Sequence, residues 1–206
     1  MNGKPEPSRA RSGRTPVDRR TEILDAAEHL YADIGFEKTT VTDLARHLGM
    51  SPANLYRHFP NRQSIDDHIA LRKLTVIEDA AWKAARGASQ DAPAAFRAMV
   101  LDVMNTTLEL QFSEQKLHQL CVVAIENKWP VVDQLVQNLQ GAVRHVIIEG
   151  RNAGVFHIAD PDVSAGAVFW SLLRVWHPQM LALYRDEHLE ALAHSICDLI
   201  LAGLEK

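Results

Sequence analysis

Apolar residues recur at helical spacing through most of this chain. From about residue 18 onward they return every three or four positions, as they do on one face of an α-helix. The first such segment carries one stripe, at steps of four, three and four, formed by Ile23, Ala27, Leu30 and Ile34. No stretch alternates between apolar and polar residues as a strand does. The pattern therefore predicts an all-α protein.

Glycine, proline and short polar runs divide this pattern into separate helices. Gly35 and Gly49 stand where the first two helices end, since glycine readily adopts the conformation that follows a helix. Pro178 lies inside the eighth segment, where it predicts a kink or a break. Because hydrophobic residues make up 47% of the chain, we expect the helices to pack around an ordinary core. The expected helices span about residues 18–34, 40–48, 52–59, 62–85, 93–111, 114–127, 131–153, 162–184 and 187–204.

The second and third helices are short, and a turn containing Gly49 joins them. Thr40 with Asp43 three residues later resembles a capping box, with Asp in place of the usual Glu or Gln. After the turn, Ser51 is a good N-cap residue and Pro52 suits the first helical position. Two short helices joined in this way form a helix-turn-helix pattern, although a plain helical hairpin with a glycine turn would read the same.

The third helix has one apolar side. Leu55 and Phe59, four residues apart, are expected to face inward and to pack on Leu44 and Leu48. The residues left off this core face are Pro52, Ala53, Asn54, Tyr56, Arg57 and His58. Small residues at the helix start allow close approach to base edges, and Asn54 can both donate and accept hydrogen bonds. We therefore expect this face to enter the major groove of DNA. The expected phosphate contacts are Thr40, Thr42, Tyr56, His58 and Arg62.

Charge is distributed unevenly along the chain. The formal net charge of −4 by itself argues against a nucleic-acid partner. However, residues 1–20 are rich in Lys and Arg, and residues 46–63 carry Arg and His without a carboxylate, whereas acids outnumber bases from residue 74 onward. A basic N-terminal end joined to an acidic body fits a DNA-binding end joined to a body with another task. Residues 1–16 are predicted to be a disordered basic arm, which either reaches along DNA or touches nothing.

The stretch from Arg20 to Ile65 resembles the N-terminal domain of the TetR family of repressors. The residues that carry the resemblance are Ile23 to Ala27, Leu30, Gly35, Thr39 to Val41, Leu44, Ala45, Leu48, Gly49, Ser51, Leu55, Tyr56, His58, Phe59 and Arg62. The family usually has Lys at the position of Arg62, and often Thr or Ser at that of Asn54. The DNA contacts predicted from the pattern and the resemblance together are Thr40, Thr42, Ser51, Pro52, Ala53, Asn54, Tyr56, Arg57, His58 and Arg62.

The resemblance also implies an organisation for the whole chain. It places a helix-turn-helix domain at residues 17–62 and an effector-binding and dimerisation domain at 63–206. Such repressors bind palindromic operator DNA as dimers and are released by a small-molecule effector. The last two expected helices, 162–184 and 187–204, would pair with those of a second subunit, and their apolar stripes agree with that role.

An effector pocket would lie among the middle helices. Trp170, Arg174 and His177 are spaced four and three apart, which predicts a shared helix face, and an arginine in an apolar run needs a partner. The residues predicted for the pocket are Met99, Met104, Phe112, His118, Cys121, Glu126, Trp129, Phe169, Trp170, Leu173, Arg174 and His177. The alternative for each of them is ordinary core or dimer interface.

Other functions find less support in the sequence. The chain has no Gly-x-Ser-x-Gly elbow, phosphate loop, dinucleotide fingerprint or zincin pair, so we expect neither an enzyme nor a cofactor nor a metal site. An all-α enzyme, and a TetR-like protein that acts through a protein partner without DNA, stay open as alternatives. No apolar run of about 18 residues and no secretory signal occur. With two cysteines expected to stay reduced, this composition predicts a cytoplasmic protein.

Overall fold

The computed structural model describes residues 16–184 and 188–206, and within these ranges the chain consists of helices and the turns between them. The predicted all-α class is therefore confirmed. The basic arm expected at 1–16 lies outside the described residues, apart from its last position. The helices are α1 (Pro16–Ile34), α2 (Val41–His47), α3 (Pro52–Tyr56), α4 (Arg62–Ala85), α5 (Ala92–Ser113), α6 (Gln115–Glu126), α7 (Pro130–Asn152), α8 (Pro161–Ser171), α9 (Leu173–Trp176), α10 (Pro178–Leu183) and α11 (Leu189–Leu204).

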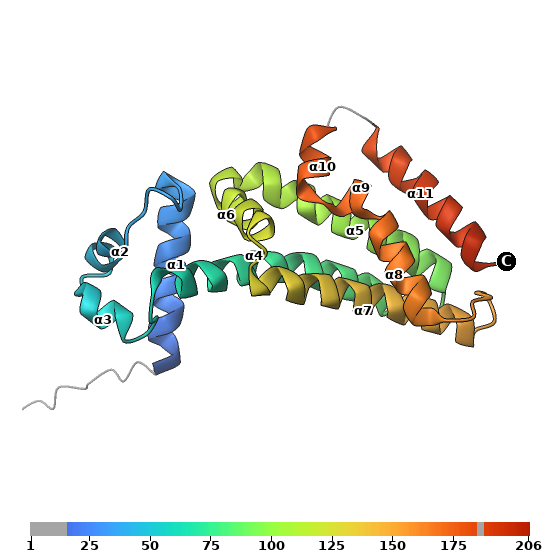
Figure 1. Ribbon diagram of the computed structural model, residues 1–206, viewed down its shortest axis with the longest axis horizontal. Helices are drawn as coiled ribbons and strands as arrows, with labels where there is room; N and C mark the ends of the chain where they lie inside the picture. The colour runs from blue at the N-terminus through green and yellow to red at the C-terminus, as the bar shows by residue number, and fades with distance from the viewer. Residues whose placement is uncertain (1–15, 185–187) are drawn as a thin grey trace, which may run out of the picture.

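The first three helices form a lobe at one end of the molecule (Figure 1). Its core contains Ile23 and Ala27 from the predicted stripe of α1, both fully buried. The last member of that stripe is an exception, because Ile34 is 43% exposed. Ile34 lies in the final turn of α1, where it lines a surface hollow beside Lys116 and Gln119 instead of entering the core.

Helix α4 joins this lobe to the second, larger one (Figure 1). Its first turns place Ile65 and Ile69 in the core of the N-terminal lobe, and its later turns place Leu74 and Ala81 in the core of the second lobe. There α4 packs mainly against α5 and α7, while α8 and α11 lie towards the end away from the first lobe and α10 stands near α6. The two hydrophobic cores therefore share one continuous helix.

The helix expected over 162–184 is divided in two places. Pro178 begins the new helix α10, as its missing N–H and fixed φ favour, and the Nδ1 atom of His177 accepts a hydrogen bond from the N–H of Gln179 at 3.3 Å. The second division, at Leu172, was not predicted because no glycine or proline marks it. The Leu172 side chain is fully buried between α8 and α9.

At the end of α7, an aromatic ring packs directly against the backbone of a glycine. The ring of Phe156, just after the helix, packs directly on Gly150, and a Cβ atom built there would lie 2.1 Å from that ring. Only glycine leaves room for this contact. Within the two described ranges, no helix combines the length and the apolar character that crossing a bilayer requires.

Candidate nucleic-acid interface and internal cavity

The start of α2 is fixed by the predicted capping box. The Thr40 hydroxyl accepts a hydrogen bond from the N–H of Asp43 at 3.1 Å, and the Asp43 carboxylate accepts from the N–H of Thr40 at 3.1 Å. The Thr40 hydroxyl also donates to that carboxylate at 2.6 Å. These hydrogen bonds from Thr40, with help from Arg46, lower the pKa of Asp43. The cap therefore occupies the Thr40 hydroxyl, whereas Thr42 is exposed on the first turn.

The turn between α2 and α3 follows the sequence signals closely. Gly49 adopts φ +63°, and the N–H of Met50 bonds back to the carbonyl of Ala45 at 2.9 Å. The Ser51 hydroxyl then caps α3 by accepting from the N–H of Asn54 at 3.2 Å, with Pro52 in the first position. Neighbouring residues therefore fix the start of α3, one as its N-cap and one in its first turn.

Helix α3 turns its apolar side inward, as predicted. Leu55 and Phe59 are fully buried, and both belong to the core that contains Leu44. The regular helix ends at Tyr56, three residues earlier than expected, and a turn carries the chain on to Phe59.

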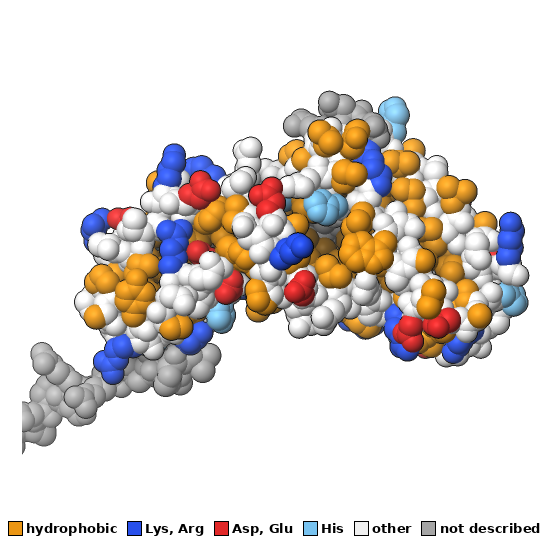
Figure 2. All heavy atoms as spheres, in the orientation of Figure 1, with side chains coloured by type: hydrophobic (Ala, Val, Ile, Leu, Met, Phe, Trp, Pro, Cys, Tyr) orange, Lys and Arg blue, Asp and Glu red, His pale blue; other side chains and the backbone are white. Residues whose placement is uncertain are grey.

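The opposite side of α3 is open. Ser51, Pro52, Ala53, Tyr56 and Arg57 are exposed, and Asn54 and His58 are half-buried. No other part of the described chain covers this face, so the side chains predicted to read DNA stay accessible. Lys and Arg side chains surround this lobe on the face shown in Figure 2.

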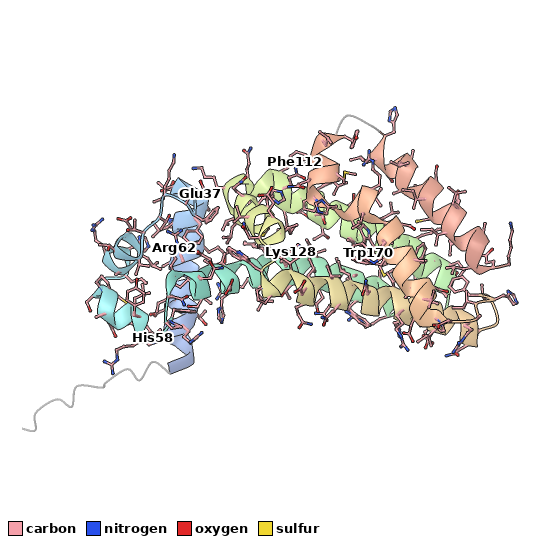
Figure 3. All side chains as sticks on the ribbon, viewed as in Figure 1. Glu37, His58, Arg62, Phe112, Lys128 and Trp170 are labelled. Atoms are coloured by element: carbon pink, nitrogen blue, oxygen red, sulfur yellow. The ribbon has the colours of Figure 1, made fainter. Side chains whose placement is uncertain are left out.

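Arg62 is placed differently from the prediction. Its guanidinium is directed into the lobe (Figure 3), where Nη1 donates to the carbonyl of Thr39 and Nη2 to that of Phe36. Its Nε atom lies 3.4 Å from the carboxylate of Asp66. Arg62 therefore has internal partners, because two carbonyls of the loop before α2 face the first turn of α4, and its phosphate contact stays a prediction.

A buried polar network continues from Arg62 into α1. The hydroxyl of Tyr31 donates to the Asp66 carboxylate at 2.5 Å. Burial raises the pKa of Asp66, and it outweighs the hydrogen bond from Tyr31 and the charge of Arg62, which act in the opposite direction. Burial and the neighbouring carboxylate together raise the pKa of Tyr31 as well. This network, which the sequence did not reveal, connects α1, α4 and the loop that leads into α2.

Arg20 forms a second clamp on the same lobe. Its Nη1 atom donates to the carbonyl of His58 at 2.6 Å, and its guanidinium lies 4.3 Å above the centre of the Phe59 ring. Its Nη2 atom is 3.4 Å from Nε2 of His68. Arg20 thus holds the turn after α3. In the sequence it is only one of several arginines in a basic run, so its role carries no local signal.

A small cavity of about 60 Å³ lies among the helices of the second lobe. Of the predicted pocket residues, only His118 and Cys121 line it. The residues that line it without having been predicted include Lys73, Ile77, Val103, Thr107, Glu114, Leu139 and Trp176. A pattern of helical stripes indicates which apolar side chains face inward, but not which side chains surround a common space.

The other predicted pocket residues lie elsewhere. Met99, Met104 and Phe169 are buried in the core, while Phe112 and Trp170 are exposed (Figure 3). Trp129 packs against the core of the first lobe, and the exposed Glu126 accepts a hydrogen bond from Gln179 at 2.9 Å. The half-buried remainder is Leu173, Arg174 and His177.

Trp170, Arg174 and His177, predicted to share one helix face, do not lie on one continuous helix. The division at Leu172 ends the helix on which their spacing depended, and each of the three now lies on or beside a different helix. The guanidinium of Arg174 lies 4.6 Å above the centre of the Tyr184 ring, which gives this arginine an aromatic partner within the same subunit.

An ion cluster stands at one end of the cavity. The ammonium of Lys73 on α4 contacts the carboxylate of Glu28 on α1 and lies 2.7 Å from that of Glu114 at the start of α6. Burial alone would lower the pKa of Lys73, but the bonds to Glu114 and Glu28 hold it above its ordinary value. The cluster therefore ties three helices together between the cavity and the first lobe.

Helix α6 belongs to both lobes. Leu120 and Ala124 are part of the core that contains α1 and α3, while His118 and Cys121 line the cavity. In addition, the ammonium of Lys116 donates to the carbonyl of Asp33 at the end of α1. One helix therefore forms a wall of the cavity and part of the packing behind the open face of α3.

Helices α8 and α11 expose large apolar side chains at the far end of the second lobe. Val163 is 68% exposed, Trp170 57% and Leu199 76%. Figure 2 shows hydrophobic side chains gathered over this region, and in Figure 3 Trp170 projects outward from α8. Exposed apolar side chains of this kind are typical of surfaces that bind another protein.

Comparison with known proteins covers both lobes. Residues 23–66 match the family model described as bacterial regulatory proteins, tetR family, and residues 92–205 match that described as tetracyclin repressor-like, C-terminal domain. The HTH-type transcriptional repressor KstR2 of Rhodococcus jostii is 42% identical over 65 residues, which span 32% of this chain and 31% of that protein. The nucleoid occlusion factor SlmA of Vibrio cholerae is 44% identical over 52 residues, 25% of this chain and 26% of its own length. The chain thus matches less than a third of the length of these two curated relatives.

A solved structure extends the likeness to nearly the whole chain. The crystal structure of the TetR family transcriptional regulator PfmR from Thermus thermophilus covers 89% of this chain and 99% of its own, with 28% identity and a TM-score of 0.57. A putative TetR-family transcriptional regulator from Mesorhizobium loti covers 92% and 98% with a TM-score of 0.67, and at 19% identity it supports the fold alone.

Proposed function

Because this chain belongs to the TetR family of bacterial transcriptional regulators, we propose that it is a ligand-responsive repressor that binds a palindromic operator as a dimer. The observation that carries the proposal is the geometry of α3. Leu55 and Phe59 anchor it in the core, and its opposite face is open for a major groove. The name of the relative KstR2, a transcriptional repressor, favours repression over activation.

On the proposed DNA-binding face, the start of α3 reads the bases. Ala53 and Pro52 are small enough for close approach, and Asn54 can pair with a base edge. We assign Tyr56, Arg57 and His58, together with Ser51 and Thr42, to contacts with the phosphates that flank the groove. Thr40 is a weaker candidate, since its hydroxyl serves the cap and the carboxylate of Asp43 beside it repels a phosphate.

In this proposal Arg62 and Arg20 are positioning residues. Arg62 holds the loop that leads into α2 by two carbonyls, and Arg20 holds the turn that follows α3. The two clamps fix both ends of the helix-turn-helix without occupying its open face. A rigid presentation lowers the entropy lost when a protein binds.

The proposed dimer forms through α8 and α11. Val163, Trp170 and Leu199 supply an exposed apolar surface, and a two-fold axis lets the same patch face its own copy. Two recognition helices related by such an axis meet half-sites about 34–36 Å apart, one turn of DNA. One subunit would bind a single half-site weakly, whereas the dimer binds both half-sites and so recognises the operator.

The proposed effector acts through α6. The cavity of about 60 Å³ has to enlarge to take a ligand, and α6 is one of its walls. Since Leu120 and Ala124 of α6 are packed in the first lobe, a shift of α6 repositions α1 and the open face of α3. A ligand that binds only the enlarged state lowers the population that fits the operator.

A gel-shift titration against the intergenic DNA upstream of the gene tests the proposal. We expect specific retention at moderate salt. Asn54→Ala should weaken specific binding about five- to a hundredfold while binding to unrelated DNA stays the same. Glu37→Gln, exposed on the loop before α2 and away from α3, is the matched control and should bind as the wild type does. The absence of specific retention by the wild-type chain would overturn the proposal.

A further inference from the structure

The size of the internal cavity limits what can occupy it. At about 60 Å³ it is smaller than the roughly 150 Å³ apolar cavity that accepts benzene in another protein. Even one ring therefore requires the walls to move, and a ligand of several rings requires much larger movements of closely packed helices. The space favours a single ring or a short chain.

The walls of the cavity are mostly apolar, and their polar groups are largely satisfied within the protein. The Thr107 hydroxyl donates to the carbonyl of Val103 at 2.8 Å, and the indole N–H of Trp176 donates to that of Val100 at 3.1 Å. Burial raises the pKa of the Cys121 thiol to about 12, so the thiol is neutral at physiological pH. These walls offer apolar contact and few hydrogen bonds.

The charged end of the cavity is already neutralised from within. Lys73 is held by Glu28 and Glu114, and Glu28 also lies 3.4 Å from Arg72, which contacts Asp25 at 2.6 Å. An anionic ligand would have to displace a carboxylate from Lys73, and a cationic one would have to displace Lys73 itself. Either exchange breaks an ion pair that the protein already supplies, so the charge of the ligand gains little in return for its lost hydration.

His118 is the polar group that remains available. No hydrogen bond among the described residues engages its ring, although its backbone N–H bonds to the carbonyl of Glu114 at 2.8 Å. Burial lowers its pKa, so the ring is neutral at pH 7 and can both donate and accept. His118 also lines a surface hollow of about 460 Å³ with Phe112 and Pro178, so it stands between the cavity and solvent.

We infer that the effector of this regulator is a small, uncharged, largely apolar molecule of about one ring, with a hydroxyl or similar group hydrogen-bonded to His118. The inference rests on the proposed function only in calling this molecule an effector, since the binding itself is a property of the second lobe. We expect the cavity to reject carboxylates and amines of the same size.

Calorimetric titration of the full chain without DNA tests this inference, with phenol, toluene, benzoate and benzylamine as size-matched probes. We expect phenol to bind at least about tenfold more tightly than benzoate and protonated benzylamine. His118→Phe should weaken phenol about three- to tenfold and leave toluene unchanged, while His118→Gln should retain most of the affinity for phenol. Ile77→Val, which enlarges the cavity slightly, should strengthen both phenol and toluene.

Several results would overturn the inference. These are tighter binding of benzoate or benzylamine than of phenol, no binding of any probe up to its solubility limit, and a phenol affinity that His118→Phe does not change. Gel shifts on the same protein samples without probes measure DNA binding separately. A chain that prefers phenol yet ignores DNA retains the ligand assignment and refutes the repressor, and the reverse result refutes the ligand assignment alone.

Discussion

Replacing Arg62 tests how the first lobe, formed by α1 to α3, is held together. In Arg62→Ala the Asp66 carboxylate, whose side chain is 8% exposed, loses its cation, and the carbonyls of Thr39 and Phe36 lose their donor. Breaking a buried ion pair on one side costs about 3–5 kcal/mol. Because the Arg62 side chain is 31% exposed, water replaces part of what is lost. We therefore expect a loss of about 2–4 kcal/mol in the free energy of unfolding, or a fall in Tm of about 5–15 °C.

Urea unfolding and calorimetry of the variant measure this loss, and DNA titrations at several salt concentrations separate it from a phosphate contact. Arg57→Ala is the matched control, because Arg57 is an exposed arginine on the same lobe. It should leave Tm within about 2 °C and reduce the slope of log affinity against log salt by about one. If Arg62→Ala instead behaved as we expect of Arg57→Ala, the internal role of Arg62 would be wrong and the phosphate contact expected from the sequence would return.

Three further predictions concern packing, pH and assembly. Gly150→Ala should destabilise the chain by about 1–3 kcal/mol, because the added methyl group has no room beside the buried ring of Phe156. Gly203→Ala, where the methyl group would meet open space, should be neutral or stabilising in the same unfolding assay. Because burial raises the pKa of Asp66 above 3.8, its carboxyl binds a proton more tightly in the native chain than in the unfolded chain. The free energy of unfolding of the wild type, relative to that of Asp66→Asn, should therefore increase as pH falls from neutral towards 3.8. A difference that stayed constant in urea unfolding across that range would contradict this. Leu199→Asp should yield monomers in sedimentation analysis while the equally apolar but remote Val76→Asp does not, and unchanged dimers in Leu199→Asp would place the interface elsewhere.

The helix-turn-helix could be predicted in detail because its signals are local. The capping box of Thr40 and Asp43 spans four residues, and Ser51 with Pro52 starts α3 within one turn. The burial of Leu55 and Phe59 follows from their spacing on one helix. In each case the physical interaction and its sequence signal lie in the same short segment.

Contacts between distant segments were not predictable in this way. The guanidinium of Arg62 meets a carbonyl of residue 36, and nothing near either residue announces the other. From the sequence alone, a basic residue after a recognition helix is interpreted as a phosphate ligand, because the position of the neighbouring loop is not known. The cavity poses the same difficulty, because Lys73, Trp176 and Leu139 come from three helices far apart in the chain. The unmarked division at Leu172 also interrupts the helix on which the spacing of Trp170 and Arg174 was judged.

The way the two cores are joined makes communication between them hard to avoid. Helix α4 contributes Ile69 to one core and Leu74 to the other, and α6 has one side in each. Close-packed interiors do not absorb an added ring by local compression, so the walls of the cavity must move as units. Two of those units are the helices on which the first lobe is packed, and the ion cluster at Lys73 ties both of them to α1. We therefore expect a ligand in the cavity to alter the first lobe, and a ligand that filled the cavity without altering operator affinity would contradict this coupling.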